Sequence, residues 1–339
     1  MTAADPTLVF DLATAFWRSN VLFSACDMGL FDLLDTEPAS LESLVHKTGA
    51  SERGLFGMLE SCVSLGLLTK DGSIYSNSPT ATAYLTTASP ESLLVTLRLQ
   101  AATYPMWMGL TKSVQTGEPA VPPGSLLGGD KALTRHFVIG MHQRALGVAK
   151  SLVDALDLSN RTLLADIGGG PGTYSVMLVR KYAQLRSRVM DLPPILEVSR
   201  ELIDASEVGD RIETVPCNVE TDDLGQGYDA ALVSGLLHRM SKDACIDILT
   251  RVYAALPDGG LVAVNDLFST SSGPEMAVLF GLQMLLTNQT GLTHSVADMA
   301  DCLKQAGFQE ISTATLPPPL PHSVVSGIKK RRSIPNDPA

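Results

Sequence analysis

The chain has 339 residues, of which 45% are hydrophobic and 18% are charged, and its formal net charge is -11. This composition predicts a folded protein with a substantial core and enough length for two domains. The acidic balance disfavours nucleic acid as a partner, because contact with phosphates needs a basic face. No apolar stretch reaches the roughly 18 clean residues of a transmembrane helix, and the first residues lack a signal-peptide pattern. We therefore expect a cytoplasmic protein without a membrane partner.

The cysteines predict reduced thiols. They are odd in number, widely spaced and free of any CxxC pair, and they stand at Cys26, Cys62, Cys217, Cys245 and Cys302. Such a set is typical of small hydrophobic side chains, and neither a disulfide framework nor a zinc site is indicated.

The N-terminal third is predicted to be mostly helical. Helical periodicity runs from Pro6 to about Leu85, with helix starts at Ser40 and Ser51 and a polar strand-turn-strand candidate over residues 68–78. This order predicts a winged-helix domain over residues 1–104. A winged helix often binds DNA, but the segment at the recognition-helix position carries one arginine against two glutamates and is mostly apolar. We therefore favour a packing role for it.

The rest of the chain is predicted to be an α/β domain preceded by a connector. Residues 105–160 are expected to form connecting helices interrupted by a Gly/Pro-rich loop. Over residues 161–328, apolar strands alternate with helical stretches, which predicts an open, Rossmann-like parallel sheet with its ligand at the carboxyl ends of the strands. The run KKRR opens a tail over residues 329–339 that we expect to be solvated.

A glycine-rich turn follows the first strand of this domain, in the stretch LLADIGGGPG. Glycine lets the backbone approach a ligand closely at a helix N-terminus. The dinucleotide fingerprint GxGxxG fails, because counting from Gly168 puts the third glycine at Thr173, and counting from Gly170 puts it at Ser175. A nicotinamide cofactor is therefore not indicated.

Two acids flank this turn at strand ends. Asp191 closes the next strand and suits the hydroxyls of a ribose, while Asp166, before the glycines, suits an ammonium group. A ligand with a ribose and an amino acid but no phosphate fits this pair, and S-adenosylmethionine is such a ligand. The alternative is that the glycines only permit helix packing and that Asp191 caps the following helix.

The sequence resembles the S-adenosylmethionine-dependent O-methyltransferases of the caffeate and acetylserotonin type. The stretches DIGGGPG, VMDLP, VPCNVETDDL and YDAALVSGLLHRM carry the resemblance, which extends over nearly the whole chain. It implies that the N-terminal winged helix is a dimerisation domain and that the protein is a homodimer. It also implies that the cofactor is bound by Asp166, Gly168, Gly170, Asp191, Leu192, Asn218, Val219 and Ser234.

The same resemblance implies a catalytic base. A phenol with a pKa of about 10 must lose its proton near neutral pH, and a histidine usually accepts it. His238 matches the family's base, and Asp266 matches the first acid that orients it, although its side chain is one carbon shorter than the usual glutamate. The second orienting acid falls at Thr293. We therefore expect His238 and Asp266 to be catalytic, in a machinery that is partly dismantled.

Several positions match stretches that line the acceptor pocket in the family. The family motif LHDW has become LHRM here, so Arg239 stands where an acid is usual. Arg239 either pairs with Asp243 on a helix or binds a substrate carboxylate. For the methionine among the remaining candidates we prefer core filling. These candidates are Trp107, His142, Arg144, Met284 and Asn288.

Three functions remain open from the sequence. We favour methyl transfer to a hydroxyl oxygen. An acceptor that needs no base, a thioether acid such as the methylthiohydroxybutyrate of dimethylsulfoniopropionate synthesis, is the alternative that the altered LHRM motif suggests. The third is a protein that binds the cofactor but no longer methylates.

Overall fold

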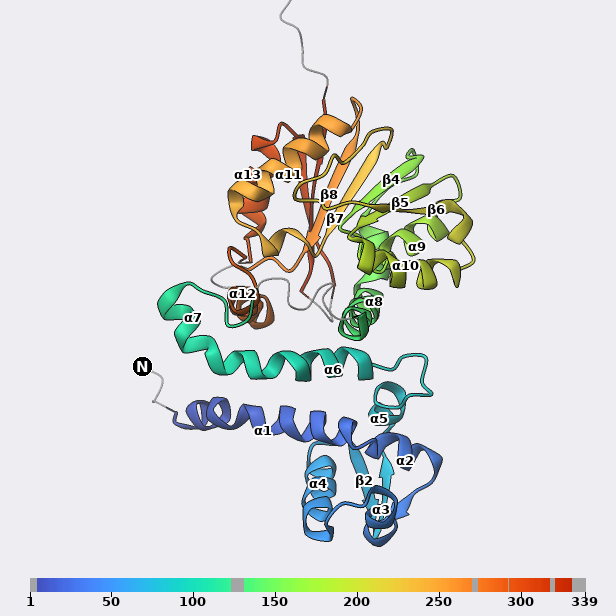
Figure 1. The fold of residues 1–339 in the computed structure, drawn as a ribbon, viewed down its shortest axis with the longest axis vertical. Coiled ribbons are helices and arrows are strands. Elements are labelled where there is room, and N and C mark those ends of the chain that lie inside the picture. Colours follow the sequence, from blue (N-terminus) through green and yellow to red (C-terminus); the bar gives the residue numbers. More distant parts are fainter. Residues whose placement is uncertain (1–4, 123–130, 270–273, 292, 318–320, 331–339) are drawn as a thin grey trace, which may run out of the picture. The chain divides into compact units, whose positions relative to one another are not determined.

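The computed structural model describes residues 5–122, 131–269, 274–291, 293–317 and 321–330. The chain divides into two units, Met1–Ala102 and Thr103–Ala339 (Figure 1).

The N-terminal unit is mostly helical. Its antiparallel sheet has the order β1-β3-β2, formed by Ala39–Ser40, Ile74–Asn77 and Leu68–Asp71. Its helices are α1 (Thr7–Asp27), α2 (Leu30–Thr36), α3 (Leu41–Thr48), α4 (Glu52–Ser64), α5 (Pro79–Tyr84) and α6 (Leu94–Thr103).

Helix caps and a small core hold this unit together. As expected, α3 begins after Ser40 and α4 after Ser51, and each serine hydroxyl accepts a hydrogen bond from the backbone N–H three residues later. The core is formed by side chains of all six helices and the sheet, with Leu30, Leu44 and Leu59 fully buried. Helix α1 differs from the other helices of this unit, because most of its apolar side chains are exposed to solvent instead of packed in the core.

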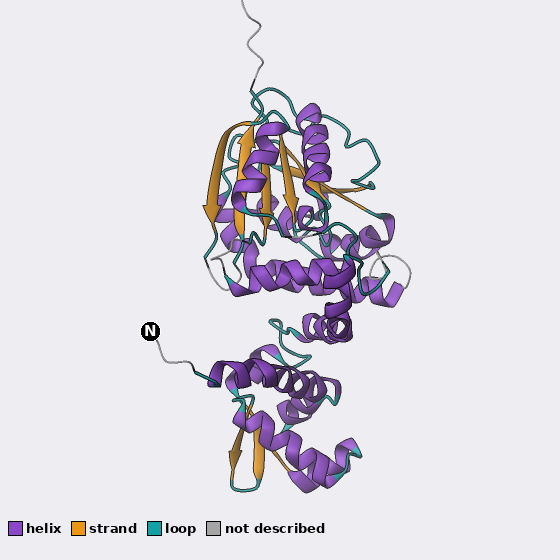
Figure 2. Ribbon diagram, turned by 90° about the vertical axis from the view of Figure 1, so that its left-hand side faces the viewer, coloured by secondary structure: helices purple, strands orange, loops and turns teal. Residues whose placement is uncertain are grey.

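The C-terminal unit contains a seven-stranded sheet of order β6-β5-β4-β7-β8-β10-β9. Figure 2 shows its strands in orange. The first five are parallel, and β10 is antiparallel to both neighbours. The sequence predicted the five parallel strands but not β9 and β10. The bounds are β4 (Leu163–Ile167), β5 (Arg186–Asp191), β6 (Ile212–Pro216), β7 (Ala230–Ser234), β8 (Leu261–Asp266), β9 (Gln309–Thr315) and β10 (Ser323–Ile328).

Helices cover both faces of this sheet (Figure 1). Alternate side chains of β4 enter two different cores, with Leu164 packed on the α8–α10 side and Ile167 on the α11 and α13 side. The helices are η1 (Tyr104–Gly109), α7 (Leu110–Thr116), α8 (Lys131–Ala155), α9 (Thr173–Lys181), α10 (Pro193–Asp204), η2 (Gly209–Arg211), η3 (Leu237–Arg239), α11 (Lys242–Ala255), α12 (Glu275–Thr287) and α13 (Val296–Gln305).

The end of the described chain is attached to α11. Lys329, expected in a solvated tail, donates to the carbonyls of Tyr253 and Leu256 at 2.8 and 2.6 Å and so binds the C-terminal end of α11. Residues 331–339 lie outside the described part.

In the part of the chain that the structure describes, no helix combines the length and apolarity needed to cross a membrane.

Candidate active site

The glycine-rich turn joins β4 to α9. Gly168, Gly170 and Gly172 all have positive φ, at 66°, 53° and 73°, which side chains rarely adopt. A Cβ at Gly169 would lie 2.7 Å from the carboxyl carbon of Asp166. The side chains are therefore absent because of the left-handed backbone and because a buried acid lies directly beneath the turn.

This acid, Asp166, is only partly satisfied. Its Oδ2 accepts a hydrogen bond from the Ser175 hydroxyl at 2.6 Å. Its Oδ1 is buried and has no hydrogen-bond partner among the described residues. Burial raises the pKa of the Asp166 carboxyl to about 6. A buried carboxylate oxygen without a donor is costly, so this position suits a ligand that brings a cationic donor to the turn.

The second acid, Asp191, lies at the carboxyl end of β5. Its Oδ2 accepts from the backbone N–H of Gly170 at 2.8 Å, and its Oδ1 accepts from that of Leu192 at 2.7 Å. Burial raises the pKa of Asp191, and these two hydrogen bonds and the charge of Arg239 oppose the rise. Helix α10 has no side-chain cap, so the interpretation of Asp191 as a helix cap was wrong. Each oxygen keeps a lone pair that can accept a hydroxyl.

The other expected cofactor residues also lie at the carboxyl ends of strands. Asn218 and Val219 follow β6, where Asn218 is exposed and Val219 is buried. The Asn218 side chain accepts from the backbone N–H of Glu220 at 3.1 Å. Ser234 ends β7, and its hydroxyl accepts from the side-chain amide of Asn265 at 2.8 Å. Together with the glycine turn, these residues form the edge at which an open α/β sheet binds its ligand.

A buried histidine and acid form a pair at the same edge. His238 lies in η3, and its Nδ1 is 2.7 Å from Oδ1 of Asp266, the last residue of β8. Burial by itself raises the pKa of Asp266, but the adjacent His238 and the hydrogen bond from the Leu267 N–H outweigh it and hold that pKa below its ordinary value. Asp266 is therefore ionised and accepts a hydrogen bond from Nδ1–H, which leaves Nε2 as the basic atom of the ring.

The sequence left open whether the short side chain of Asp266 reaches the histidine, and it does. The second expected acid is absent, and the Thr293 hydroxyl donates to Ser269 at 2.8 Å. Of the two expected positions, Asp266 is therefore the one that contacts His238.

An aromatic ring that the sequence analysis missed borders this pair. Phe280 of α12 meets the His238 ring edge to face, with the ring centroids 4.9 Å apart. On the same phenylalanine ring, the Arg144 guanidinium carbon lies 5.2 Å from the centroid. The available signal was helical spacing, because Phe280 precedes the buried Met284 by one turn.

Arg239 does not form the helical ion pair that was one of its two interpretations. It lies in η3, ahead of Ser241, the N-cap of α11, and its Nε donates to the Asn288 side-chain oxygen at 3.3 Å. A pair with Asp243 requires both residues on one helix, so that interpretation was wrong.

The remaining candidates take up different positions. The Trp107 indole N–H donates to the Gln283 side chain at 2.7 Å, which ties η1 to α12. His142 Nδ1 lies 2.8 Å from the Thr173 hydroxyl at the start of α9, and burial lowers its pKa. Both residues are partly buried.

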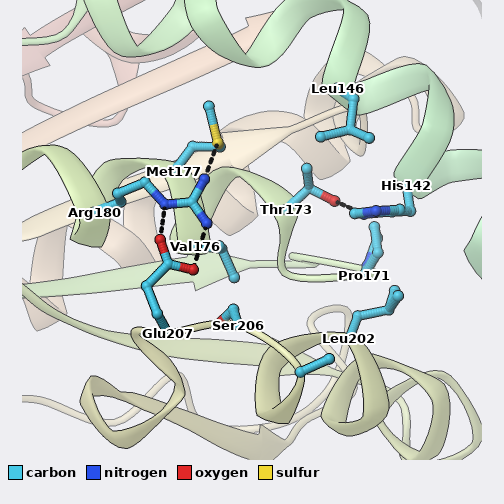
Figure 3. Close-up of a pocket in the computed structure, with 11 residues that line it drawn as sticks. His142, Leu146, Pro171, Thr173, Val176, Met177, Arg180, Leu202, Ser206 and Glu207 are labelled. Carbon is cyan, nitrogen blue, oxygen red and sulfur yellow. Dashed lines mark hydrogen bonds and ion pairs between the residues drawn. The ribbon is translucent and has the colours of Figure 1, made fainter. Parts of the chain in front are cut away.

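A cavity of about 210 Å³ opens beside His142 (Figure 3). It lies among α8, α9 and α10, and the pair of Arg180 and Glu207 borders it. Neither Asp191 nor His238 lines it. This cavity is therefore not a pocket of the histidine and acid pair.

Comparison with known proteins gives two family matches. Residues 117–309 match the O-methyltransferase domain, and residues 10–87 match the O-methyltransferase dimerisation domain. A 3-hydroxy-5-methyl-1-naphthoate 3-O-methyltransferase of Streptomyces sahachiroi is 31% identical, over 96% of this chain and 95% of its own. The acetylserotonin O-methyltransferase of Gallus gallus is 29% identical, over 90% and 93%.

Solved structures agree. Human N-acetylserotonin methyltransferase in complex with S-adenosylmethionine superposes with a TM-score of 0.87 at 25% identity, covering 98% of this chain and 100% of the human one. The two family matches, the full-length relatives and the shared fold point the same way. The chain belongs to the family of S-adenosylmethionine-dependent O-methyltransferases.

Proposed function

We propose that this protein methylates a hydroxyl oxygen on a small aromatic acceptor. The observation that carries the proposal is the buried pair of His238 and Asp266, whose 2.7 Å hydrogen bond leaves Nε2 free to accept a proton. The Phe280 ring beside the histidine gives an aromatic acceptor an apolar surface. The relatives support this chemistry, since the Streptomyces protein is named for O-methylation of a hydroxynaphthoate.

The cofactor-binding part of the proposal rests on the edge described above. When bound, S-adenosylmethionine supplies a methyl group activated by a sulfonium. Asp166 would hold its ammonium group, directly or through water, and Asp191 would accept hydrogen bonds from the ribose hydroxyls. The backbone of the glycine turn permits close approach. The full proposed set is Asp166, Gly168, Gly170, Asp191, Leu192, Asn218, Val219 and Ser234.

The chain's own residues handle the proton. His238 Nε2 takes the proton of the acceptor hydroxyl, and the charge of Asp266 stabilises the imidazolium that results. The other pocket residues orient the acceptor, because an in-line displacement depends strongly on alignment. We place Trp107, Arg144, Arg239, Met284 and Asn288 in this group. His142 is left out, because it contacts Thr173 beside the glycine turn and borders a different cavity.

The intact pair also separates this proposal from its alternatives. A thioether sulfur carries no proton, so an S-methyltransferase has no use for an oriented base. A protein that only binds the cofactor has no use for it either. The His238–Asp266 pair therefore favours oxygen as the acceptor atom over both.

A transfer assay tests the function directly. Labelled S-adenosylmethionine is incubated with the enzyme and a panel of naphthols, smaller phenols and thioether acids, and the products are separated. We expect label in the O-methyl ethers of the hydroxylated aromatics. Label in a thioether acid and in none of the phenols would contradict the proposal.

We also propose that the N-terminal unit pairs two copies of the chain, with its winged helix in a packing role. The supporting observation is α1, whose exposed apolar side chains would be unfavourable on a monomer. Sedimentation velocity checks this proposal, and a monomer at micromolar concentration would refute it. The exposed side chains are Leu8, Val9, Phe10, Leu12, Phe16 and Trp17.

A further inference from the structure

Arg144 stands apart from the charged side chains around the active site. It projects from α8 and stacks its guanidinium on Phe280. Burial lowers the pKa of the guanidinium, while Asp266 and Tyr174 raise it. The residue nevertheless keeps partial solvent access. The Arg144 side chain is therefore mostly surrounded by protein but still accessible to solvent, as expected for a group that lines a binding site.

The guanidinium lacks an anionic partner. Across the described segments of the chain, no hydrogen bond or ion pair to Arg144 is formed, and its direct contact is with the ring of Phe280. Arg135 on the same helix shows the usual situation, since it pairs with Glu201 at 2.7 Å. The acid whose charge acts most strongly on Arg144 is Asp266. Its carboxylate already accepts hydrogen bonds from the His238 ring and from the Leu267 N–H. A buried cation without an anion costs free energy.

The position of this cation relative to the base is defined by one side chain. Phe280 contacts the His238 ring at 4.9 Å between centroids and the Arg144 guanidinium at 5.2 Å. Arg144 and His238 thus lie one aromatic side chain apart. An acceptor whose hydroxyl reaches His238 can present another group to Arg144, whose planar fork of N–H donors matches a carboxylate.

We propose that Arg144 binds a carboxylate on the acceptor, so that the preferred substrate is a hydroxylated aromatic acid. The inference rests on the O-methylation proposed above and adds the substrate class to it. The cofactor also carries a carboxylate, which is the competing partner for Arg144. The contacts favour the acceptor, because His142 is the α8 side chain that bonds to the start of α9 after the glycine turn, whereas Arg144 stacks on the ring beside the base.

The test compares an acid with its neutral analogue. The probes are 6-hydroxy-2-naphthoate and its methyl ester, and the enzymes are the wild type, Arg144→Met, Arg144→Lys and the control Arg135→Met. Each is assayed for kcat/KM. Acceptor binding is measured by calorimetry on enzyme saturated with S-adenosylhomocysteine, and the affinity for S-adenosylhomocysteine itself is measured separately.

We expect the wild type to prefer the acid by about 10-fold or more, which is the effect of a charge-assisted pair. Arg144→Met should abolish the preference, Arg144→Lys should keep part of it, and Arg135→Met should keep all of it. Equal use of acid and ester by the wild type, or a preference that survives in Arg144→Met, would overturn the inference. So would a loss of S-adenosylhomocysteine affinity in Arg144→Met as large as the loss of acid preference, because the cofactor carboxylate would then be the partner.

The two proposals fail in different ways. If neither probe is methylated, the proposed function fails for this class. The calorimetric comparison of acid and ester still decides whether Arg144 binds the carboxylate.

Discussion

Asp166 and Asp266 are both buried at the carboxyl edge of one sheet, yet their environments differ. Asp266 is satisfied within the chain by His238 and Leu267, and its pKa is held below the ordinary value. Asp166 has one satisfied oxygen and one without a partner among the described residues, and burial raises its pKa to about 6. The difference separates an acid that the chain itself satisfies, in the pair proposed to be catalytic, from an acid that we propose a cationic ligand completes.

The largest effect is expected from removing His238, the proposed base. His238→Ala should lower turnover of a hydroxynaphthalene by roughly 100-fold or more, because general base catalysis contributes about that much. Affinity for S-adenosylhomocysteine should be unchanged, since we place the pair of His238 and Asp266 on the acceptor side. Steady-state kinetics and calorimetry measure the two quantities. The exposed His136 supplies the control His136→Ala, and equal losses in both variants would count against the assignment.

Substitution of Asp166, the partly satisfied acid, should change the affinity for the cofactor product, which substitution of His238 should leave unchanged. Asp166→Asn should weaken binding of S-adenosylhomocysteine by roughly 10-fold, since a hydrogen bond to a charged group is lost. The matched control is Asp204→Asn at an exposed position on α10. Calorimetric titration gives both affinities, and an unchanged affinity in Asp166→Asn would remove Asp166 from the cofactor site.

The raised pKa of Asp166 predicts two opposite pH effects. Its protonated form predominates below about pH 6, so the affinity for S-adenosylhomocysteine should weaken as the pH falls below 6. Without ligand, the stability contributed by this group is present below its unfolded pKa of about 3.8 and is lost as the pH rises through about 6.

Titrations and thermal melts between pH 5 and 8 check both effects, compared with Asp166→Asn, which should show neither. Parallel pH curves for the wild type and this variant would show that another group titrates. Such a result would remove the contrast between the two acids.

A separate effect, on stability and not on ligand binding, is expected at the turn above Asp166. Gly169→Ala places a Cβ 2.7 Å from a buried carboxyl carbon, which should destabilise the fold by about 1–3 kcal/mol. Gly147→Ala on α8 meets no atom within 4 Å and should be neutral or stabilising, because alanine favours a helix. Chemical denaturation measures both. A stable Gly169→Ala variant would show that the turn and Asp166 are less tightly packed than described.

The site was predicted from the sequence where residue type and strand position were sufficient. Asp166, Asp191 and His238 follow apolar runs, so the topology itself brings them to one edge. The strand β9 was missed because its side chains are largely exposed and polar, and a strand of this kind lacks the apolar alternation that marks a half-buried strand. The helix position of Arg239 was wrong because η3 ends before the better N-cap, Ser241.

Phe280 and the unpaired state of Arg144 depend on tertiary contacts. An aromatic residue at helical spacing predicts core packing as readily as a binding site. Whether an arginine finds an acid depends on which helices meet. Sequence patterns carry neither kind of information.

The central claim is that His238 acts as the base for a hydroxyl acceptor, and a series of phenols of decreasing pKa tests it most directly. Single-turnover rates of methyl transfer are measured across this series for the wild type and for His238→Ala. We predict that the loss caused by the substitution shrinks as the phenol becomes more acidic, because an ionised acceptor needs no base. An equal loss for every phenol would mean that His238 has a structural role and does not take the proton.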